Sequence, residues 1–304
     1  MEMRKIGPTA LRSSRLVHGC MRLVGDGSAA ARARGLAALE AAVEVGINHF
    51  DHADIYGRGA SEALFCEFLA AHPGLRGDLI ITSKCGVRRA DDPQAGAPAR
   101  YDLSAAHMES AVEGILTRLG LEQIDILLLH RPDYLMDPDE IAGVFARLHG
   151  AGKVAHFGVS NLSPSQLEMI RQVSPFPLVM HQVEFNLHRV APLTDGVLDQ
   201  CRRRGITPQA WCPLGAVAYP AWGSTLSPAQ TERLRGELER QAGVYGSPPA
   251  GIALAWILRH PAGVLPVIGS MSPAHIRDAV AALDLAYTRE DWYRLLEARQ
   301  GKVP

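Results

Sequence analysis

The stretch NHFDHADIYGRG, residues Asn48–Gly59, places a short β-rich run in front of an aspartate and a tyrosine. Asp51 ends the apolar run, and Tyr56 follows it in a turn bounded by glycine. Taken alone, such an aspartate is most often a turn or cap residue, and such a tyrosine a packing residue. Their meaning depends on the rest of the chain, in which a short strand followed by a helix recurs from end to end.

Strand-like runs alternate with amphipathic helical patterns along all 304 residues. The expected strands are Leu16–Met21, Asn48–Asp51, Leu79–Lys84, Asp125–His130, Val154–Ser160, Leu178–Glu184, Ile206–Trp211 and Val264–Ile268. The expected helices are Ala29–Val45, Ser61–Ala70, Ala105–Leu119, Pro138–Ala151, Pro164–Val173, Leu193–Arg204, Pro228–Gln241, Pro249–His260 and Pro273–Leu283. Several of them begin with a capping residue followed by proline, as at Asp137-Pro138 and Ser163-Pro164.

Eight strand–helix units with short connections predict a parallel sheet. No linker or composition break divides the chain, and the first strand is not followed by the G-x-G-x-x-G of an open dinucleotide-binding sheet. The pattern therefore favours one α/β domain over residues 1–304, a closed (β/α)8 TIM barrel. An N-terminal hairpin at Arg4–Ser14 and an extra C-terminal helix at Arg289–Ala298 are expected as additions.

Composition excludes several classes of function. The net charge of −1 gives no reason to expect nucleic acid or an anionic membrane as a partner. Five widely spaced cysteines without C-x-x-C indicate reduced thiols rather than a disulfide framework. The chain opens without an apolar segment of signal-peptide length, and no later run reaches the roughly 18 apolar residues of a membrane span. We therefore expect a cytoplasmic protein.

The chemistry of such a barrel lies at the carboxyl ends of its strands, which makes the polar residues there the candidates. The second strand ends in Asp51 with Tyr56 beyond it, the third in Lys84 and the fourth in His130. Alternation along the third strand puts Lys84 on the face of Ile80, so that it points into the barrel mouth. The chain has four lysines among 31 basic residues. An ammonium behind an apolar strand needs a partner, and Asp51 is the obvious one.

Such a cluster suits the reduction of a carbonyl group. A nearby ammonium favours the phenolate and so lowers the pKa of Tyr56 from its usual value of about 10. Asp51 would hold Lys84 charged and in place. A neutral His130 can donate a hydrogen bond to a carbonyl oxygen while Tyr56 gives that oxygen a proton. No side chain delivers hydride, so a cofactor must supply it.

Four ordered segments resemble the aldo-keto reductase superfamily, and the resemblance spans almost the whole chain. GINHFDHADIYG resembles the family signature G-x-x-x-x-D-T-A-x-x-Y-G, with His52 where many members have threonine. ITSKCG and IDILLLHRPD match the segments that carry the family lysine and histidine. KVAHFGVSN resembles G-K-x-R-x-x-G-V-S-N, with Lys153 at the lysine position. Bacterial oxidoreductases of this superfamily share the segments DHADIYG and HRPD.

The resemblance implies a role for each of the four candidates. Tyr56 would be the general acid, Lys84 the neighbour that lowers its pKa, Asp51 the partner of the lysine, and His130 the residue that orients the carbonyl.

The resemblance also implies a cofactor, NADPH or less often NADH, bound extended across the barrel mouth. Ser160, Asn161 and Gln182 would hold the nicotinamide carboxamide, and Trp211 would stack on the nicotinamide ring. The remaining implied contacts are Met21, the pyrophosphate loop Cys212, Pro213, Leu214 and Gly215, and the adenosine-phosphate residues Gly269, Ser270, Met271, His275, Arg277 and Asp278.

The last turn departs from the family pattern G-[AS]-[RK]-x-P-x-x-x-x-E-N, because this chain reads IGSMSPAHIRDA. Met271 stands where a basic residue often contacts the 2′-phosphate, and Asp278-Ala279 replaces the adenine-binding pair. Ser270 remains a phosphate donor at a helix N-terminus, and His275 or Arg277 would supply charge. The alternative is that Arg277 lies on a solvated helix face. We expect a preference for NADPH that is weaker than usual.

Three loops should shape the substrate pocket. They contribute aromatic side chains, which predicts a small to medium, partly apolar aldehyde or ketone. The loops are Gly86–Asp102, Arg131–Met136 and Ala216–Thr225, with Tyr101, Tyr134, Tyr219 and Trp222. Little chain follows the terminal helix, so no large specificity loop is expected there.

Two other functions stay open. A metal-dependent hydrolase would use His52, His130 and His181 as ligands, but it leaves Lys84 unexplained; the motif around the histidines favours structural roles and no metal site. A cofactor-binding regulatory subunit with incidental turnover is the second, as in the β subunits of voltage-gated potassium channels. Cys85 is either a low-pKa thiolate or a buried residue facing the helices. The resemblance favours a monomer.

Overall fold

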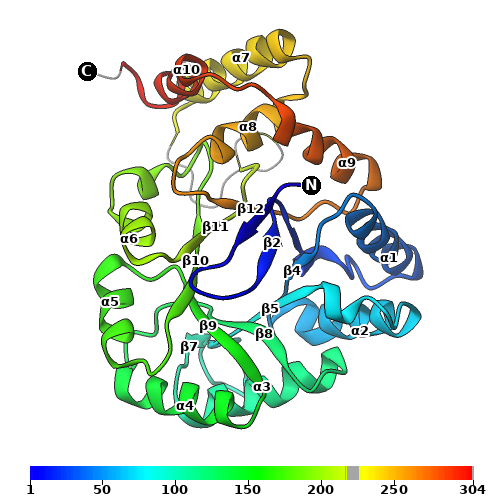
Figure 1. The fold of residues 1–304 in the computed structure, drawn as a ribbon, viewed down its shortest axis with the longest axis vertical. Helices are drawn as coiled ribbons and strands as arrows, with labels where there is room; N and C mark the ends of the chain where they lie inside the picture. Colours follow the sequence, from blue (N-terminus) through cyan, green and yellow to red (C-terminus); the bar gives the residue numbers. More distant parts are fainter. Residues whose placement is uncertain (216, 218–225, 303–304) are drawn as a thin grey trace.

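Eight parallel strands close into a barrel with helices around it (Figure 1). The computed structural model describes residues 1–215, 217 and 226–302. The order around the barrel is β10-β11-β12-β3-β4-β5-β8-β9, so consecutive strands of the chain lie side by side. The bounds are β3 (Val17–Gly19), β4 (His49–Asp51), β5 (Ile80–Cys85), β8 (Ile124–Leu129), β9 (Val154–Ser160), β10 (Leu178–Glu184), β11 (Thr207–Trp211) and β12 (Leu265–Ile268). The predicted TIM barrel is confirmed.

Helices cover the outside of the barrel. They are α1 (Ala29–Glu44), α2 (Ala60–Ala71), α3 (Ala105–Leu119), α4 (Pro138–Gly150), α5 (Pro164–Val173), α6 (Val197–Arg204), α8 (Pro249–Leu258) and α9 (Pro273–Ala281). Two more, α7 (Pro228–Tyr245) and α10 (Arg289–Gln300), lie together beyond α8 (Figure 1). Asp291 joins them, because Arg240 and the hydroxyl of Tyr245 both bond to its carboxylate. The predicted terminal helix is therefore present and has α7 as its partner.

The helix starts follow from the sequence. Ser163 and Ser227 accept a backbone N–H three residues on, and the glutamine at that position returns the bond, which makes a capping box at each. One expected start was wrong: the helix predicted from Leu193 begins at Val197. Gly196 there adopts a left-handed conformation with φ of 87°, which interrupts the helix, and Asp195 caps the new start.

The first strand is also shorter than predicted. It ends at Gly19, and Cys20–Arg22 form a 3₁₀ turn that leaves the Met21 side chain 47% exposed on the rim of the mouth. In the long loop after β5, two short strands pair antiparallel, β6 (Val87–Arg88) with β7 (Arg100–Tyr101).

The predicted N-terminal hairpin pairs β1 (Met3–Lys5) with β2 (Arg12–Ser14) and closes the amino-terminal end of the barrel. Ile6 from its turn enters a buried cluster inside the barrel, which contains Ile80, Ile126, Leu128, Val179 and Met180. The turn is tied to β11 by a bond from the Gly7 N–H to Thr207 Oγ1 of 2.9 Å. The hairpin therefore acts as the floor of the barrel.

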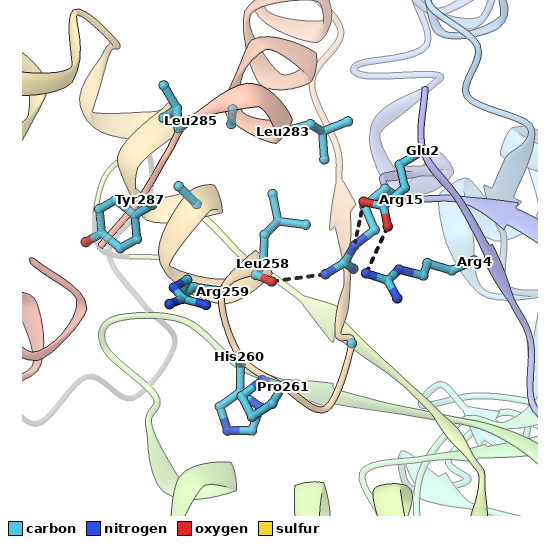
Figure 2. Close-up of a pocket in the computed structure, with 13 residues that line it drawn as sticks. Glu2, Arg4, Arg15, Leu258, Arg259, His260, Pro261, Leu283, Leu285 and Tyr287 are labelled. Carbon is cyan, nitrogen blue, oxygen red and sulfur yellow. Dashed lines mark hydrogen bonds and ion pairs between the residues drawn. The ribbon is translucent and has the colours of Figure 1, made fainter. Parts of the chain in front are cut away.

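Arg15 fastens this floor to the last strand–helix unit (Figure 2). Its guanidinium donates to the carbonyl oxygens of Leu258, at 3.1 Å, and of Val264. The side chain is buried, so these bonds satisfy donors that water cannot reach.

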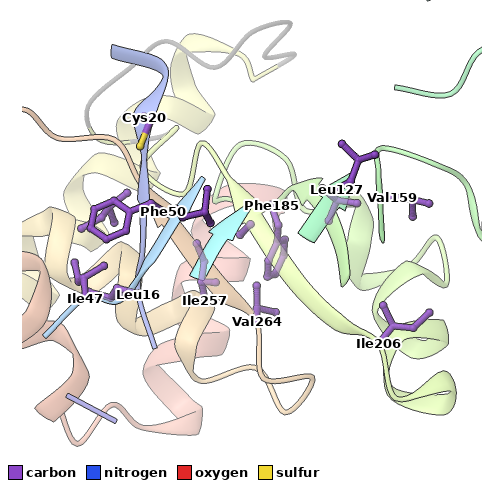
Figure 3. Packing of buried hydrophobic residues seen from close by; sticks show 14 of the residues in the cluster. Leu16, Cys20, Ile47, Phe50, Leu127, Val159, Phe185, Ile206, Ile257 and Val264 are labelled. Carbon is purple, nitrogen blue, oxygen red and sulfur yellow. The ribbon is translucent and has the colours of Figure 1, made fainter. Parts of the chain in front are cut away.

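The main hydrophobic core lies between the barrel and the helices (Figure 3). Leu127 and Val159 point outward into it from neighbouring strands, while Leu128 points inward. Cys85 belongs to this outer layer. Alternation along the strands therefore separates an outer apolar layer from an inner face that carries Thr82, Lys84 and Gln182, as the sequence predicts. Among the described residues, no helix is long and apolar enough to cross a membrane.

Candidate active site

Lys84 is the centre of the site at the mouth of the barrel. Its ammonium lies 2.6 Å from Asp51 Oδ2, 2.8 Å from the carbonyl oxygen of His52 and 3.2 Å from the hydroxyl of Tyr56. The lysine is fully buried, and Asp51 is nearly so. A buried ammonium is tolerated when a carboxylate and further acceptors surround it, and here they do. The pairing of Lys84 with Asp51 that the sequence predicts is confirmed.

Tyr56 is held over the lysine by a tight turn, residues Tyr56–Gly59, in which Gly57 and Arg58 both have left-handed backbone angles. Gly57 has φ of 56°, and a Cβ atom there would lie 2.7 Å from Val24 Cγ2, so the position requires glycine. The phenol ring meets the His130 imidazole edge-on, with ring centroids 6.0 Å apart. Residues from three strands, β4, β5 and β8, thus meet at one spot.

Lys84 acts on the pKa of Tyr56 in the expected direction, because its charge and its hydrogen bond both lower that pKa. Burial raises the pKa of Tyr56 above its usual value, and the opposing pull of the Lys84 ammonium does not cancel it. For Lys84, burial alone would lower the pKa. The charges and hydrogen bonds of Asp51 and Tyr56 outweigh burial, and the pKa of Lys84 is raised. The resting pair is therefore a neutral phenol on a firmly protonated lysine.

His130 is neutral at physiological pH. Burial lowers its pKa well below the usual value, and the positive charges of Lys84 and Arg131 lower it further. Its Nδ1 atom is buried without a hydrogen-bond partner among the described residues. A neutral imidazole with one ring nitrogen buried can present the other to a ligand oxygen, as the sequence argument requires.

Gln182 contacts the tetrad, by which we mean the four candidates Asp51, Tyr56, Lys84 and His130, from the opposite side of the barrel. Its amide nitrogen donates to Asp51 Oδ1 and to Gln209 Oε1, both at 2.8 Å. Gln209 was not among the predicted site residues. No motif marks Gln209, which lies in the middle of β11. Alternation along that strand from its end is what places the Gln209 side chain on the inner face. Gln182 therefore positions Asp51 as well as lying among the expected carboxamide contacts.

Asn161, Ser160 and Trp211 form the expected nicotinamide end. Asn161 has φ of 62°, which turns its amide back so that Nδ2 donates to Ser160 Oγ at 2.8 Å and to the carbonyl oxygen of His130 at 3.2 Å. Asn161 Oδ1 accepts from the indole Nε1 of Trp211 at 2.8 Å. The guanidinium of Arg131 lies over the indole, 5.4 Å from the ring centroid. The Asn161 amide thus links Trp211 on one side with Ser160 and His130 on the other.

The loop Cys212–Gly215 is shaped by an unusual backbone. Cys212 has φ of 53°, and its carbonyl oxygen accepts from Asn186 Nδ2 at 3.0 Å. A Cβ atom on Gly215 would lie 2.7 Å from the same Asn186 atom, so only glycine fits there. The positive charge of Arg22 acts on the Cys212 thiol, although burial and Glu184 still raise the pKa of that thiol. Arg22 is therefore a positive charge near this turn, and the sequence reasoning did not single it out.

The expected adenosine-phosphate end lies after β12. Gly269, Ser270 and Met271 are half-buried there, and His275 and Asp278 are exposed on α9. Ser270 Oγ accepts from the Ser272 N–H at 3.2 Å. Arg277 is exposed and pairs with Glu44 of α1, with 3.1 Å between Nη2 and Oε2. Arg277 therefore lies on a solvated face of the helix, which was the alternative to a role in phosphate binding.

A second buried cluster supports the Tyr56 turn from below. Glu62 is fully buried and accepts from Ser83 Oγ at 2.8 Å and from Arg118 Nε at 2.7 Å. The Asp54 N–H donates to the carbonyl oxygen of Lys84 at 3.1 Å. Burial and then the charge of Glu62 raise the pKa of Asp54 to about 7. A glutamate on the apolar face of α2 was the available signal for this cluster.

The three-histidine metal alternative finds no support in the geometry. His52 packs edge-on against Phe65, with centroids 4.6 Å apart, on the helix side of β4. No group of three metal-binding side chains occurs within residues 1–215, 217 and 226–302. The low-pKa alternative for Cys85 is wrong, because burial raises the pKa of its thiol well above the usual value.

The substrate loops are described in part. Tyr101 and Tyr134 lie on neighbouring loops with ring centroids 6.3 Å apart, and Tyr134 is 83% exposed. Tyr219 and Trp222 of the third loop lie outside the described residues.

Comparison with known proteins gives the class. Residues 15–300 match the Aldo/keto reductase family. Oxidoreductase YdhF of Escherichia coli (strain K12) is 37% identical over 301 residues, 97% of each chain. A 6-dehydroglucose reductase of Agrobacterium fabrum (strain C58 / ATCC 33970) is 34% identical over 295 residues, 96% of each chain.

A solved structure agrees in fold. The glycerol dehydrogenase AKR11B4 from Gluconobacter oxydans superposes with a TM-score of 0.85 at 24% identity, over 99% of this chain and 97% of that one. Fold and relatives together define a (β/α)8-barrel oxidoreductase. The chain belongs to the aldo/keto reductase family.

Proposed function

We propose that this aldo-keto reductase reduces an aldehyde or ketone to an alcohol, with Tyr56 as the proton donor and NADPH or NADH as the hydride donor. The observation that carries the proposal is the chain of contacts from Asp51 through the buried Lys84 to the hydroxyl of Tyr56. When bound, the nicotinamide supplies a hydride to the carbonyl carbon.

Each member of the tetrad has a role in this reaction. As negative charge develops on the substrate oxygen, Tyr56 gives that oxygen its proton, and the ammonium 3.2 Å away stabilises the phenolate that remains. Asp51 keeps Lys84 in place through one carboxylate oxygen, while Gln182 holds the other. Neutral His130, edge-on to the phenol, orients the carbonyl.

The raised pKa of Tyr56 in the free protein fits an acid that gives up its proton only during hydride transfer. An anionic tyrosine at rest would have no proton to give. The site therefore depends on the lysine to stabilise the phenolate at the moment it forms, rather than to ionise the tyrosine beforehand.

For the cofactor, Ser160, Asn161 and Gln182 would hold the carboxamide, and Trp211 would stack on the ring. Met21, Arg22 and the Cys212–Gly215 turn would lie along the pyrophosphate. Without a basic residue at Met271 and with Arg277 paired to Glu44, we expect NADPH to be favoured only moderately over NADH. The ratio of kcat/KM for the two cofactors measures this, and a clear preference for NADH contradicts it.

The substrate class follows from the mouth and from the relatives. Tyr101 and Tyr134 offer aromatic surface, while Arg131 and His130 offer hydrogen-bond donors. A relative at 34% identity is named a 6-dehydroglucose reductase, which puts sugar-derived aldehydes in the substrate panel beside aromatic and aliphatic aldehydes, α-dicarbonyls and quinones. A location in the cytoplasm and a monomeric state remain predictions.

The test is consumption of NADPH or NADH with this panel, comparing the wild type with Tyr56→Phe. Loss of the proton donor should lower kcat/KM by about 100-fold or more while cofactor binding persists. Tyr245→Phe removes a hydroxyl that bonds to Asp291 between α7 and α10, outside the active site, and serves as the matched control. Turnover that survives in Tyr56→Phe would refute the role of Tyr56. Tight cofactor binding without turnover on any carbonyl would favour the regulatory-subunit alternative.

A further inference from the structure

Two cavities share the turn Arg259–Pro261, which connects α8 to β12, and Figure 2 shows the residues that line the first. Their volumes are about 320 and 280 Å³, and both are lined by Arg259, His260 and Pro261. Together they form one groove, which we call the α8–β12 groove. None of the predicted site residues lines it.

The groove lies at the end of the barrel away from the active site. Gly263, just before β12, and Arg15, just before β3, line its first cavity, so it opens where the strands begin. The candidate adenosine-phosphate residues follow the other end of β12. Four strand residues separate the two ends, which is roughly 13 Å along an extended chain. A ligand in the groove therefore would not overlap the cofactor.

Positive charge dominates the groove. Arg4, Arg15 and Arg259 line the first cavity, and Arg259 and Arg289 line the second. Glu2 is the one carboxylate among these lining residues, with its oxygens 2.8 Å from Arg4 and 3.8 Å from Arg15. Arg259 and Arg289 form no ion pair with any residue that the structure describes.

The buried Arg15 shows the same excess of positive over negative charge. It is 3% exposed and bonds to two backbone carbonyls, neither of which carries a full charge. Burial and then the like charge of Arg4 lower the pKa of Arg15, Glu2 offsets only a part, and the pKa lies at about 10. An anion in the first cavity would supply the missing negative charge.

The second cavity adds a flat, rigid aromatic surface. Trp292 stacks on Trp256 with centroids 5.0 Å apart and planes 6° from parallel. Each indole N–H donates to the backbone carbonyl of the other residue, at 3.0 and 3.1 Å, which locks the pair. Tyr293 meets Trp292 edge-on and is 41% exposed. Trp292 and Tyr293 both line the cavity beside Arg289.

We propose that the α8–β12 groove is a second binding site of this protein, for an organic anion that carries a flat apolar group. The anionic oxygens, of a phosphate or a carboxylate, would pair with Arg259 and its arginine neighbours. The flat group would lie on the surface of Trp292 and Tyr293. The site is independent of the proposed carbonyl reduction.

The test is calorimetric titration of the full chain, with and without saturating NADPH, using phenyl phosphate as the probe. Binding should persist with NADPH present, because the candidate pyrophosphate loop lies elsewhere. The double variant Arg259→Gln/Arg289→Gln should bind at least tenfold more weakly. The matched control Arg147→Gln removes an exposed arginine of α4, far from the groove, and should bind as the wild type does.

Further probes separate the two halves of the ligand. Inorganic phosphate should bind more weakly than phenyl phosphate, and the neutral benzyl alcohol should not bind. Benzoate compared with phenyl phosphate tells a carboxylate ligand from a phosphate ligand. Absence of binding, or equal affinity in the double variant, overturns the site; equal affinity for inorganic and phenyl phosphate overturns the role of the aromatic surface. If the double variant does not fold, Arg4→Gln provides the same comparison.

Discussion

Asp51 and Gln182 stand on opposite strands of the barrel and are joined across its interior by a hydrogen bond of 2.8 Å. Their strands, β4 and β10, are four places apart in the ring of eight. The second oxygen of Asp51 lies 2.6 Å from the Lys84 ammonium. The position of the lysine under Tyr56 is thus set by the closed barrel itself rather than by a loop.

Replacing Asp51 by asparagine should destabilise the protein strongly. It leaves Lys84 as a buried charge without a counter-ion, and breaking such a pair costs about 3–5 kcal/mol. Urea unfolding at pH 7 measures the change. The matched control is Glu109→Gln, which breaks an exposed pair with Arg147 and should cost no more than about 1 kcal/mol. Equal stability of the two variants would contradict the view that Lys84 depends on Asp51.

Stability should fall steeply on the acid side. Burial lowers the pKa values of His18 and His181 to about 4 and of His49 and His52 to about 3, and that of His130 is also well below normal. In the unfolded chain these groups take up protons near pH 6.5, so below that pH the unfolded state binds more protons and is favoured. Urea midpoints between pH 8 and pH 5 measure this.

The expected slope is up to about 1.4 kcal/mol per pH unit for each histidine. His52→Leu removes one of these groups and should reduce the slope by about one proton. A urea midpoint that does not change from pH 8 to pH 5 would show that the histidines are not neutral in the native protein.

Asp54 should act in the opposite direction. Its pKa is raised to about 7, so between the unfolded aspartate pKa of about 3.9 and pH 7 the native state binds more protons than the unfolded state, and stability falls as the pH rises through that window. Asp54→Asn removes this cost and should stabilise the protein at pH 8 by about 1 kcal/mol or more. At pH 5.5 about half of this pH window has been crossed, so the variant should gain only about half as much there. The same gain at both pH values would argue against a titrating Asp54.

The pH dependence of carbonyl reduction follows from the same shifts. Because the pKa of Tyr56 is raised and the reaction needs its proton, kcat/KM should stay level in alkaline solution until the pH passes about 10, the usual tyrosine pKa. Because the pKa of His130 is well below normal, the acid side should show no fall near pH 6.5. Titration of tyrosine absorbance in the wild type against Tyr56→Phe locates the group directly. A kinetic pKa below about 9 would mean that Lys84 outweighs burial after all.

Gly215→Ala should distort the Cys212–Gly215 turn. The added Cβ would lie 2.7 Å from Asn186 Nδ2, and such crowding typically costs about 1–3 kcal/mol. We expect weaker cofactor binding as well. Gly236→Ala is the matched control: it lies in the middle of α7 with open space around it and should stabilise by about 0.5–1 kcal/mol. An unchanged cofactor Kd in Gly215→Ala would separate this turn from the cofactor.

Local patterns predict much of this fold. The bounds of α3, α5, β9 and β10 agree with the sequence expectation, because a capping serine marks the start of each of the two helices and a valine- or leucine-led run marks each strand. The meeting of Asp51, Lys84 and His130 could also be predicted, since parallel strands bring their carboxyl ends together in any closed barrel.

Contacts across the mouth could not be predicted in this way. Whether Lys84 or burial controls the pKa of Tyr56 depends on a balance between desolvation and charge at distances of about 3 Å, and no spacing in the chain encodes it. The bond from Trp211 to Asn161 joins residues 50 apart and depends on a left-handed asparagine. The network of Glu62 and Arg118 likewise joins two helices through side-chain length rather than sequence position.

Because the N-terminal hairpin covers one end of the barrel, the barrel is open only at its mouth. Ile6 and the apolar cluster around it close the end opposite Tyr56, which leaves the rim as the open end of the barrel. A bound nicotinamide would then lie between the solvent and the innermost part of the barrel mouth. In the proposed reduction, the proton that returns to Tyr56 and the alcohol product would both pass through this opening, so the residues of the rim would control both events.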